Sequence, residues 1–175
     1  MRFLAAGTSL RIVLVPVVMG LVLAHGHDGP ACALFVVAAM TDYLDGYLAR
    51  RWRVTTTLGS FLDTTADKLL VSGGLVALVS VHRASAWIAV LIIARELVIL
   101  GLRGAVAAEG TVIKPSSLAR SKTAVQFLAI ALAIPRPGHR LGGLYLDEWA
   151  MLAAGAITLA SAVDYLARYA ATLRG

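Results

Sequence analysis

The chain has 175 residues, of which 59% are apolar and only 15% are charged, and its mean hydropathy is +0.80. Soluble domains usually have about 45–50% apolar and about 25% charged residues. The composition therefore favours a polytopic membrane protein and excludes a disordered chain, collagen and a disulfide-rich secreted module. The lone cysteine, Cys32, excludes an internal disulfide and a cysteine zinc cluster. In so apolar a chain, the net charge of +6 fits cytoplasmic loops and phosphate-bearing ligands better than nucleic acid.

Six apolar segments are each long enough to span a bilayer, which takes about 17–25 helical residues. Turn-rich or charged stretches separate them. The sequence contains no internal repeat and no boundary of a second domain. We therefore expect one all-α integral-membrane domain, residues 1–175, with transmembrane helices near 8–24, 30–49, 58–80, 85–106, 119–135 and 148–169.

Arginine and lysine gather at one end of this predicted bundle. With six spans, the two termini share that end with the loops near 50–57 and 109–117. The opposite loops hold only Arg83, Arg136 and Arg140. The positive-inside rule then predicts a multi-pass protein of the plasma membrane with both termini in the cytoplasm. A first span that is a signal peptide, cleaved near Val22-Leu23-Ala24, is the alternative.

Four of the ten acidic residues lie in one short window, although a charge at mid-span costs about 2.5–3.5 kcal/mol. Asp42 and Asp45 share one face of the second predicted helix, and Asp63 and Asp67 share one face of the third. A short loop makes these helices antiparallel neighbours, so the two faces can converge. Protonation or cationic partners are alternatives, but an all-oxygen ligand set suits Mg²⁺ or Mn²⁺, and a pair of ions suits phosphoryl chemistry.

Small residues accompany these acids. Gly46 and Ala49 lie beside Asp45 on the same predicted face and leave a depression where a ligand can approach the backbone. Arg50 ends that helix and offers a phosphate a forked donor. Helix packing explains each small residue taken alone, but it does not explain four acids on two facing stripes.

The window from Thr41 to Lys68 reads TDYLDGYLARRWRVTTTLGSFLDTTADK. It resembles the signature D-x2-D-G-x2-A-R-x8-G-x3-D-x3-D of the CDP-alcohol phosphatidyltransferases. The fixed positions all match, and they are Asp42, Asp45, Gly46, Ala49, Arg50, Gly59, Asp63 and Asp67. The six-helix plan is similar to that of the family across nearly the whole chain.

The resemblance implies roles for these residues. The four aspartates would hold two divalent cations, and Asp67 would also be the general base. Gly46, Ala49, Arg50 and Thr56 would bind the donor, CDP-diacylglycerol; for Thr56 a helix N-cap is an equal alternative. An alcohol would attack the phosphatidyl phosphorus and CMP would leave, with a carboxylate accepting the proton of the alcohol. The family is commonly dimeric, which implies a homodimer among membrane lipids.

A second stretch resembles one branch of that family, the bacterial phosphatidylglycerophosphate synthases. It runs R-E-L through G-L-R to R-S-K-T-A-V-Q, with Arg120 where the branch usually has lysine. Arg95, Arg103, Arg120 and Lys122 would gather near the cytoplasmic side, where a phosphorylated acceptor such as glycerol 3-phosphate needs cations. For Arg95 the alternative is a structural pair with an acid of the third span, and for Arg120 and Lys122 it is ordinary positive-inside charge.

Other acceptors remain open at this point. Inositol phosphate would also need a cationic pocket, whereas phosphatidylglycerol, which would give cardiolipin, would need a more apolar one. A divalent-cation transporter is a different class, because acids within spans also line cation pathways. It predicts acids spread across the membrane depth, whereas here they cluster in one helix pair.

Overall fold

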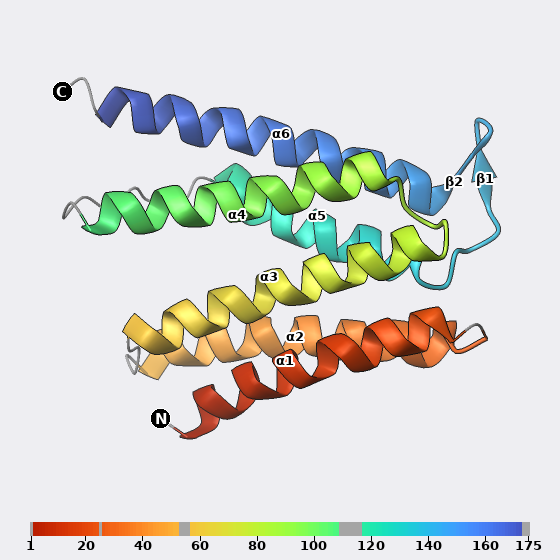
Figure 1. Ribbon diagram of the computed structural model, residues 1–175, viewed down its shortest axis with the longest axis horizontal. Coiled ribbons are helices and arrows are strands. Elements are labelled where there is room, and N and C mark those ends of the chain that lie inside the picture. Colours follow the sequence, from red (N-terminus) through yellow and green to blue (C-terminus); the bar gives the residue numbers. More distant parts are fainter. Residues whose placement is uncertain (1, 25, 53–56, 109–116, 173–175) are drawn as a thin grey trace.

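The computed structural model describes residues 2–24, 26–52, 57–108 and 117–172, without the side chains of 2–9, 42–52, 57–61, 117, 120, 171 and 172. Within these ranges the chain forms six α-helices and one small hairpin (Figure 1). The elements are α1 (Arg2–Leu23), α2 (Asp28–Trp52), α3 (Thr57–Ser80), α4 (Ala86–Ala108), α5 (Ser117–Ala133), β1 (Arg140–Leu141), β2 (Leu144–Tyr145) and α6 (Leu146–Thr172).

Each predicted apolar segment is helical, which confirms the predicted number and order of the helices. Whether each helix can cross a bilayer depends on its length and composition. In the part of the chain that the structure describes, only α6 is long and apolar enough to cross a bilayer, over Leu146–Ala170. Leu10–Leu23, Asp28–Thr41 and Ser121–Ala133 are shorter apolar stretches. The charges within α2 to α5 interrupt the apolar runs of those helices.

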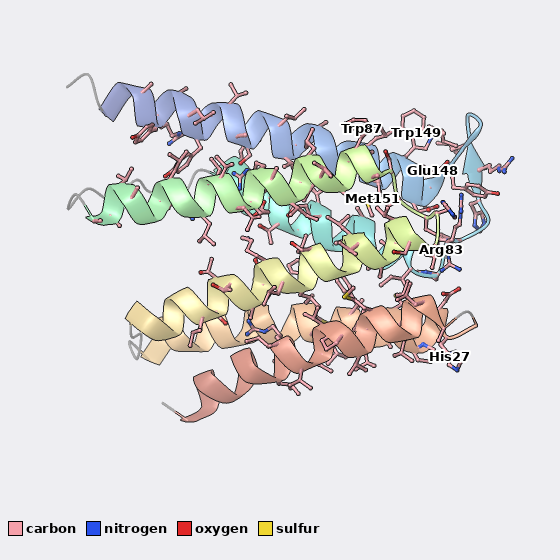
Figure 2. All side chains as sticks on the ribbon, viewed as in Figure 1. His27, Arg83, Trp87, Glu148, Trp149 and Met151 are labelled. Carbon is pink, nitrogen blue, oxygen red and sulfur yellow. The ribbon has the colours of Figure 1, made fainter. Side chains whose placement is uncertain are left out.

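The helices lie roughly along one axis and alternate in direction (Figure 1). We call the left end in that view the terminal end, because α1 begins and α6 ends there; α2 and α4 also end there, and α3 and α5 begin there. The other end, with β1 and β2, is the hairpin end. The labelled Trp87 and Trp149 lie at the hairpin end (Figure 2).

Helix α3 joins the two halves of the bundle. It packs most extensively along α1, and it also contacts α4 and α5, whereas α5 and α4 pack on α6. The contact between α2 and α3 is shorter than the sequence leads us to expect, because α1 packs against both helices. At Gly73 of α3, a Cβ atom would lie 2.6 Å from Cγ1 of Val15, so the close approach of α1 and α3 requires glycine there.

A small hairpin lies within the turn-rich stretch that separates the last two helices, as an addition to what we expected there. Gly142 and Gly143 have φ of +58° and +91° and form its turn, and Arg140 pairs with Tyr145 across the strands. The Gly-Gly pair is a hairpin signal that the sequence already contained. Nearby, Arg83 forms an ion pair of 2.7 Å with Asp28 and donates to the carbonyl oxygen of Ile134, so it joins the turn after α3 to α2 and α5.

Candidate active site

Two of the predicted acids lie on adjacent turns of α3. Asp67 is 9% exposed, and its Oδ2 accepts a hydrogen bond of 2.9 Å from Nζ of Lys68. Its Oδ1 is buried and has no hydrogen-bond partner among the residues that the structure describes. A buried carboxylate oxygen without a partner is costly, so it indicates a missing cation or donor.

Asp63 is more exposed and has a cationic partner. Its Oδ1 accepts a hydrogen bond of 2.8 Å from the guanidinium of Arg11, a side chain that is only 1% exposed. Arg11 comes from α1, so this ion pair joins the same two helices that pack closely at Gly73. This pair was not predicted, because nothing in the sequence pattern places α1 beside Asp63.

The other predicted residues lie where the structure describes less. Asp42, Asp45, Gly46, Ala49 and Arg50 belong to the last turns of α2, and their side chains are outside the described part. Gly59 lies in the first turn of α3, whereas Thr56 lies outside the described residues altogether. Among the side chains that are described, no three or more acids, histidines or cysteines gather as a metal site. The set of four aspartates therefore stays a prediction.

A polar cavity of about 120 Å³ opens between α3, α4, α5 and α6. Its volume is several times what one water molecule needs. Four cationic side chains and one acidic side chain line it, so its charge is positive. The lining residues are Thr64, Lys68, Arg95, Glu96, Ile99, Leu100, Arg103, Ala119, Lys122, Thr123 and Tyr165. The cavity lies toward the terminal end, because Arg103 is near the end of α4 and Lys122 near the start of α5.

Glu96 is the centre of the polar network beside this cavity, and it is only 3% exposed. Its carboxylate accepts from Lys122 of α5, from Nζ of Lys68 at 2.8 Å and, more weakly, from Nε2 of Gln126 at 3.4 Å. Gln126 also donates to Oγ1 of Thr158 at 2.9 Å. One buried carboxylate therefore joins α3, α4 and α5 and, through Gln126, reaches α6.

Two hydrogen-bond donors on the cavity wall have no partner among the described residues. They are Nε of Arg95 and the hydroxyl of Tyr165, and both are buried. The guanidinium of Arg103 lies over the Tyr165 ring, 5.9 Å from its centroid. Unpaired buried donors in a positively charged cavity are the surroundings that an anion with several oxygens satisfies.

The structure brings together three of the four residues predicted to bind an acceptor phosphate. Arg95, Arg103 and Lys122 all line the one cavity, whereas the side chain of Arg120 is outside the described part. The alternative for Arg95, a pair with an acid of the third helix, is wrong. Its described hydrogen bonds go to Glu96 at 3.3 Å and to Ser161 at 2.8 Å.

Sequence reasoning missed other residues of the cavity. Lys68 directly follows Asp67 and lies inside a predicted span, where a lone lysine requires a partner, so the signal for it was present. For Thr64 and Tyr165 there was no such signal, because their place depends on how α3 and α6 pack.

An apolar groove of about 460 Å³ lies between α2 and α5. Its lining is Phe35, Val36, Ala39, Met40, Phe127, Leu128 and Ala131. Phe35 and Phe127 pack with their ring centroids 5.8 Å apart. Phe35 precedes Asp42 by seven residues on one helix, which is about 10 Å at the rise of an α-helix. The groove therefore begins close to the acidic end of α2.

Comparisons with known proteins identify the family of the chain. A sequence profile described as CDP-alcohol phosphatidyltransferase matches residues 5–162. Three similar proteins carry the name CDP-diacylglycerol–glycerol-3-phosphate 3-phosphatidyltransferase. The Bacillus subtilis protein is 34% identical, over 92% of this chain and 91% of its own length. The Sodalis glossinidius protein is 41% identical (91% and 90% covered), and that of Pseudomonas fluorescens is 38% identical (91% and 85% covered).

Proposed function

The chain belongs to the CDP-alcohol phosphatidyltransferase family, and on that premise we propose that it makes phosphatidylglycerol phosphate. In this reaction the phosphatidyl group of CDP-diacylglycerol passes to glycerol 3-phosphate, and CMP is released. The relatives' printed name states the same donor and acceptor. The observation that carries the proposal here is the cationic cavity with unpaired donors, connected to Asp67 through Lys68.

The chemical step needs a base for the acceptor hydroxyl, and we assign this role to Asp67. The hydroxyl oxygen attacks the phosphorus of the phosphatidyl group, the bond from phosphorus to the CMP oxygen breaks, and the hydroxyl proton passes to Asp67. Asp67 is buried on α3, so its carboxylate is kept away from bulk water. Its unpartnered Oδ1 is available for a ligand.

Asp42, Asp45, Asp63 and Asp67 would hold two divalent cations, Mg²⁺ or Mn²⁺. The unpartnered Oδ1 of Asp67 and the all-carboxylate donor set fit hard cations. Bound there, the cations would neutralise the pyrophosphate of the donor and the charge that develops on CMP. EDTA is expected to stop CMP release and added Mg²⁺ to restore it; full activity in excess EDTA would contradict this assignment.

The donor lipid would lie along α2. We assign its CDP group to Gly46, Ala49, Arg50 and Thr56, at the acidic end of that helix and just beyond it. The apolar groove between α2 and α5 would then bind an acyl chain of the donor. With the lipid phosphate at Asp42, the glycerol backbone of the donor would lie where this groove begins. Its wholly apolar lining and its position next to the signature favour the donor's own chain over an unrelated apolar partner.

The acceptor phosphate would lie in the cavity. Lys68, Arg95, Arg103 and Lys122 give it four positive charges against the one of Glu96, and a phosphate monoester carries about −1.5 to −2 at neutral pH. Nε of Arg95 and the hydroxyl of Tyr165 would complete their hydrogen bonds to its oxygens. Arg120 belongs to the same proposal, from the helix turn just before Lys122.

The proposed setting is a plasma membrane that all six helices cross, with the terminal end in the cytoplasm and, following the family resemblance, as a homodimer. The acidic end of α2 and the cationic cavity both lie toward the terminal end, where water-soluble glycerol 3-phosphate and CMP exchange. This placement is supported by the alternating helix directions and by the excess of basic residues at that end.

A panel of acceptors tests the proposed reaction. Purified protein with CDP-diacylglycerol and Mg²⁺ is expected to release CMP with glycerol 3-phosphate, and much less with inositol phosphate or phosphatidylglycerol. CMP release with one of the other acceptors alone would overturn the acceptor assignment and keep the chemistry. Metal flux into liposomes without any CMP release would instead identify the protein as a divalent-cation transporter.

A further inference from the structure

Lys68 contacts two acids that have different places in the molecule. Its Nζ lies 2.9 Å from Oδ2 of Asp67 and 2.8 Å from Oε2 of Glu96. Asp67 is the carboxylate to which we assign the proton of the acceptor, whereas Glu96 lies on the wall of the cationic cavity. A single ammonium group therefore connects the base with the cavity in which we place the acceptor phosphate.

Glu96 is well placed to hold this lysine. Its carboxylate is buried and also accepts from Lys122 and Gln126, so its position is fixed from two other directions. The lysine itself has a long flexible stem with four rotatable bonds, so its ammonium group can move by a few ångströms while α3 stays in place. In this group of charges, Glu96 is therefore fixed and Lys68 can move.

A dianion in the cavity would compete for this ammonium group. Lys68 lines the cavity together with Arg95, Arg103 and Lys122, so a phosphate bound there would also contact Lys68. The attraction between a phosphate dianion and an ammonium group exceeds that of a single carboxylate, and it is strong where water is excluded. The ammonium group of Lys68 has three N–H donors, and two of them are used by Asp67 and Glu96. A phosphate that takes more than one of these donors withdraws the lysine from Asp67 or Glu96.

We propose that Lys68, held by Glu96, is a positioning residue that keeps Asp67 occupied until the phosphate of the acceptor enters the cavity and draws the lysine away. Oδ2 of Asp67 is then open to receive the hydroxyl proton. This inference rests on the proposed function and adds an order of events to it. The acceptor phosphate, which does not react, binds first and thereby frees Asp67 to act as the base. Water, which lacks a phosphate, would leave Asp67 paired, so the donor would be protected from hydrolysis.

The test divides the acceptor into two pieces. The purified full-length protein with CDP-diacylglycerol and Mg²⁺ is given glycerol, which has the hydroxyl but no phosphate, and phosphite dianion is added to fill the cavity. Phosphite is not consumed. We expect it to raise the rate of CMP release with glycerol by about 5- to 150-fold, the usual range of coupling between two sites. Phosphite that leaves the glycerol rate unchanged would overturn the proposal.

Variants assign the effect to Lys68. In Lys68→Met the activation by phosphite is expected to fall below about twofold. The glycerol rate without phosphite is expected to rise, because Asp67 has lost its lysine partner. Lys68→Arg is expected to restore part of the activation. Glu96→Gln removes a competitor for the lysine, so half-maximal activation is expected at a lower phosphite concentration. Activation that persists in Lys68→Met at full size would contradict the proposal.

Two controls separate this inference from its alternatives. Arg136 forms an ion pair of 3.5 Å with Glu148 beside the hairpin, and neither residue lines the cavity. Arg136→Met also removes a cation paired with an acid, and it is expected to keep the full activation. If the unchanged protein releases CMP with glycerol 3-phosphate but phosphite does not activate glycerol, the coupling fails while the proposed function stands. If glycerol 3-phosphate itself is not an acceptor, the proposed function fails first.

Discussion

At the scale of single residues, chemistry depends on which buried groups still lack a partner. Oδ1 of Asp67, Nε of Arg95 and the hydroxyl of Tyr165 have none among the described residues. One is an acceptor on α3 and two are donors on the cavity wall. Their types match what each proposed ligand would supply, because a cation needs the carboxylate and an anion needs the donors.

The base assignment predicts the result of Asp67→Asn. The amide has nearly the same shape but cannot take the hydroxyl proton, so CMP release is expected to fall by about 10²–10⁴-fold, the usual contribution of a general base. Binding of CDP-diacylglycerol, measured by titration, is expected to weaken far less. Asp164→Asn, on an acid of α6 that pairs with Arg168, is the matched control and should keep its activity. Turnover retained in Asp67→Asn would move the base elsewhere.

The acceptor pocket predicts a different kinetic change for Arg103→Ala. Arg103 lines the cavity and is exposed rather than buried in the Glu96 network, so its removal should leave the fold intact. The KM for glycerol 3-phosphate is expected to rise by about tenfold or more, as the loss of one charge-assisted hydrogen bond implies. The KM for CDP-diacylglycerol should hardly change. Equal effects on both substrates would exclude a role in acceptor binding.

At the scale of helices, the sequence pattern predicted where each helix lies along the chain, but not which helices pack against each other. The apolar runs located all six helices, because a run of that length in a membrane chain has few alternatives to a helix. They did not predict that α1 packs along α3, since both helices have apolar residues on more than one face. The Arg11–Asp63 pair depends on that packing, and the Lys68–Glu96 pair depends on how α3 packs against α4. These pairs were therefore not predictable, whereas the signature acids were recognisable from spacing alone.

The close packing of α1 and α3 predicts a stability difference between two glycines. A methyl group at Gly73 would meet Cγ1 of Val15 at 2.6 Å, so Gly73→Ala is expected to destabilise the protein by about 1–3 kcal/mol. At Gly20 of α1 nothing lies within 4 Å, so Gly20→Ala should be neutral or stabilising by about 0.5–1 kcal/mol. Thermal unfolding in detergent compares them. A Gly73→Ala protein as stable as Gly20→Ala would contradict the packing of these two helices.

The groove between α2 and α5 predicts a change in lipid preference. Ala131 lines it, so Ala131→Phe is expected to fill the groove and raise the KM for long-chain CDP-diacylglycerol by several-fold, with little effect on a short-chain donor. Val37 of α2 is 57% exposed and lies outside the groove, so Val37→Phe is the matched control. CMP release with donors of two chain lengths measures both. An equal effect on both donors would place the acyl chain elsewhere.

At the scale of the whole molecule, the two ends of the bundle differ in what they offer. The hairpin end holds the strands, the exposed Trp87 and Trp149, and Arg83 (Figure 2), which pairs with Asp28. The cavity lies toward the terminal end. A soluble, charged acceptor must reach the cavity from the side on which it is made. The proposed acceptor and the charge distribution therefore both favour the proposed orientation, with the terminal end in the cytoplasm.

That orientation predicts which ends of the chain an impermeant reagent reaches. Cys32 is the lone cysteine and is half-buried, so a Cys32→Ala background leaves no native thiol. In that background, His139→Cys beside the hairpin is expected to react with a membrane-impermeant maleimide on intact cells. Ala170→Cys, exposed near the end of α6, should react only after the membrane is permeabilised. Labelling of Ala170→Cys in intact cells, with protection of His139→Cys, would reverse the proposed topology; labelling of both from outside would mean that the helices do not separate the two ends by a bilayer.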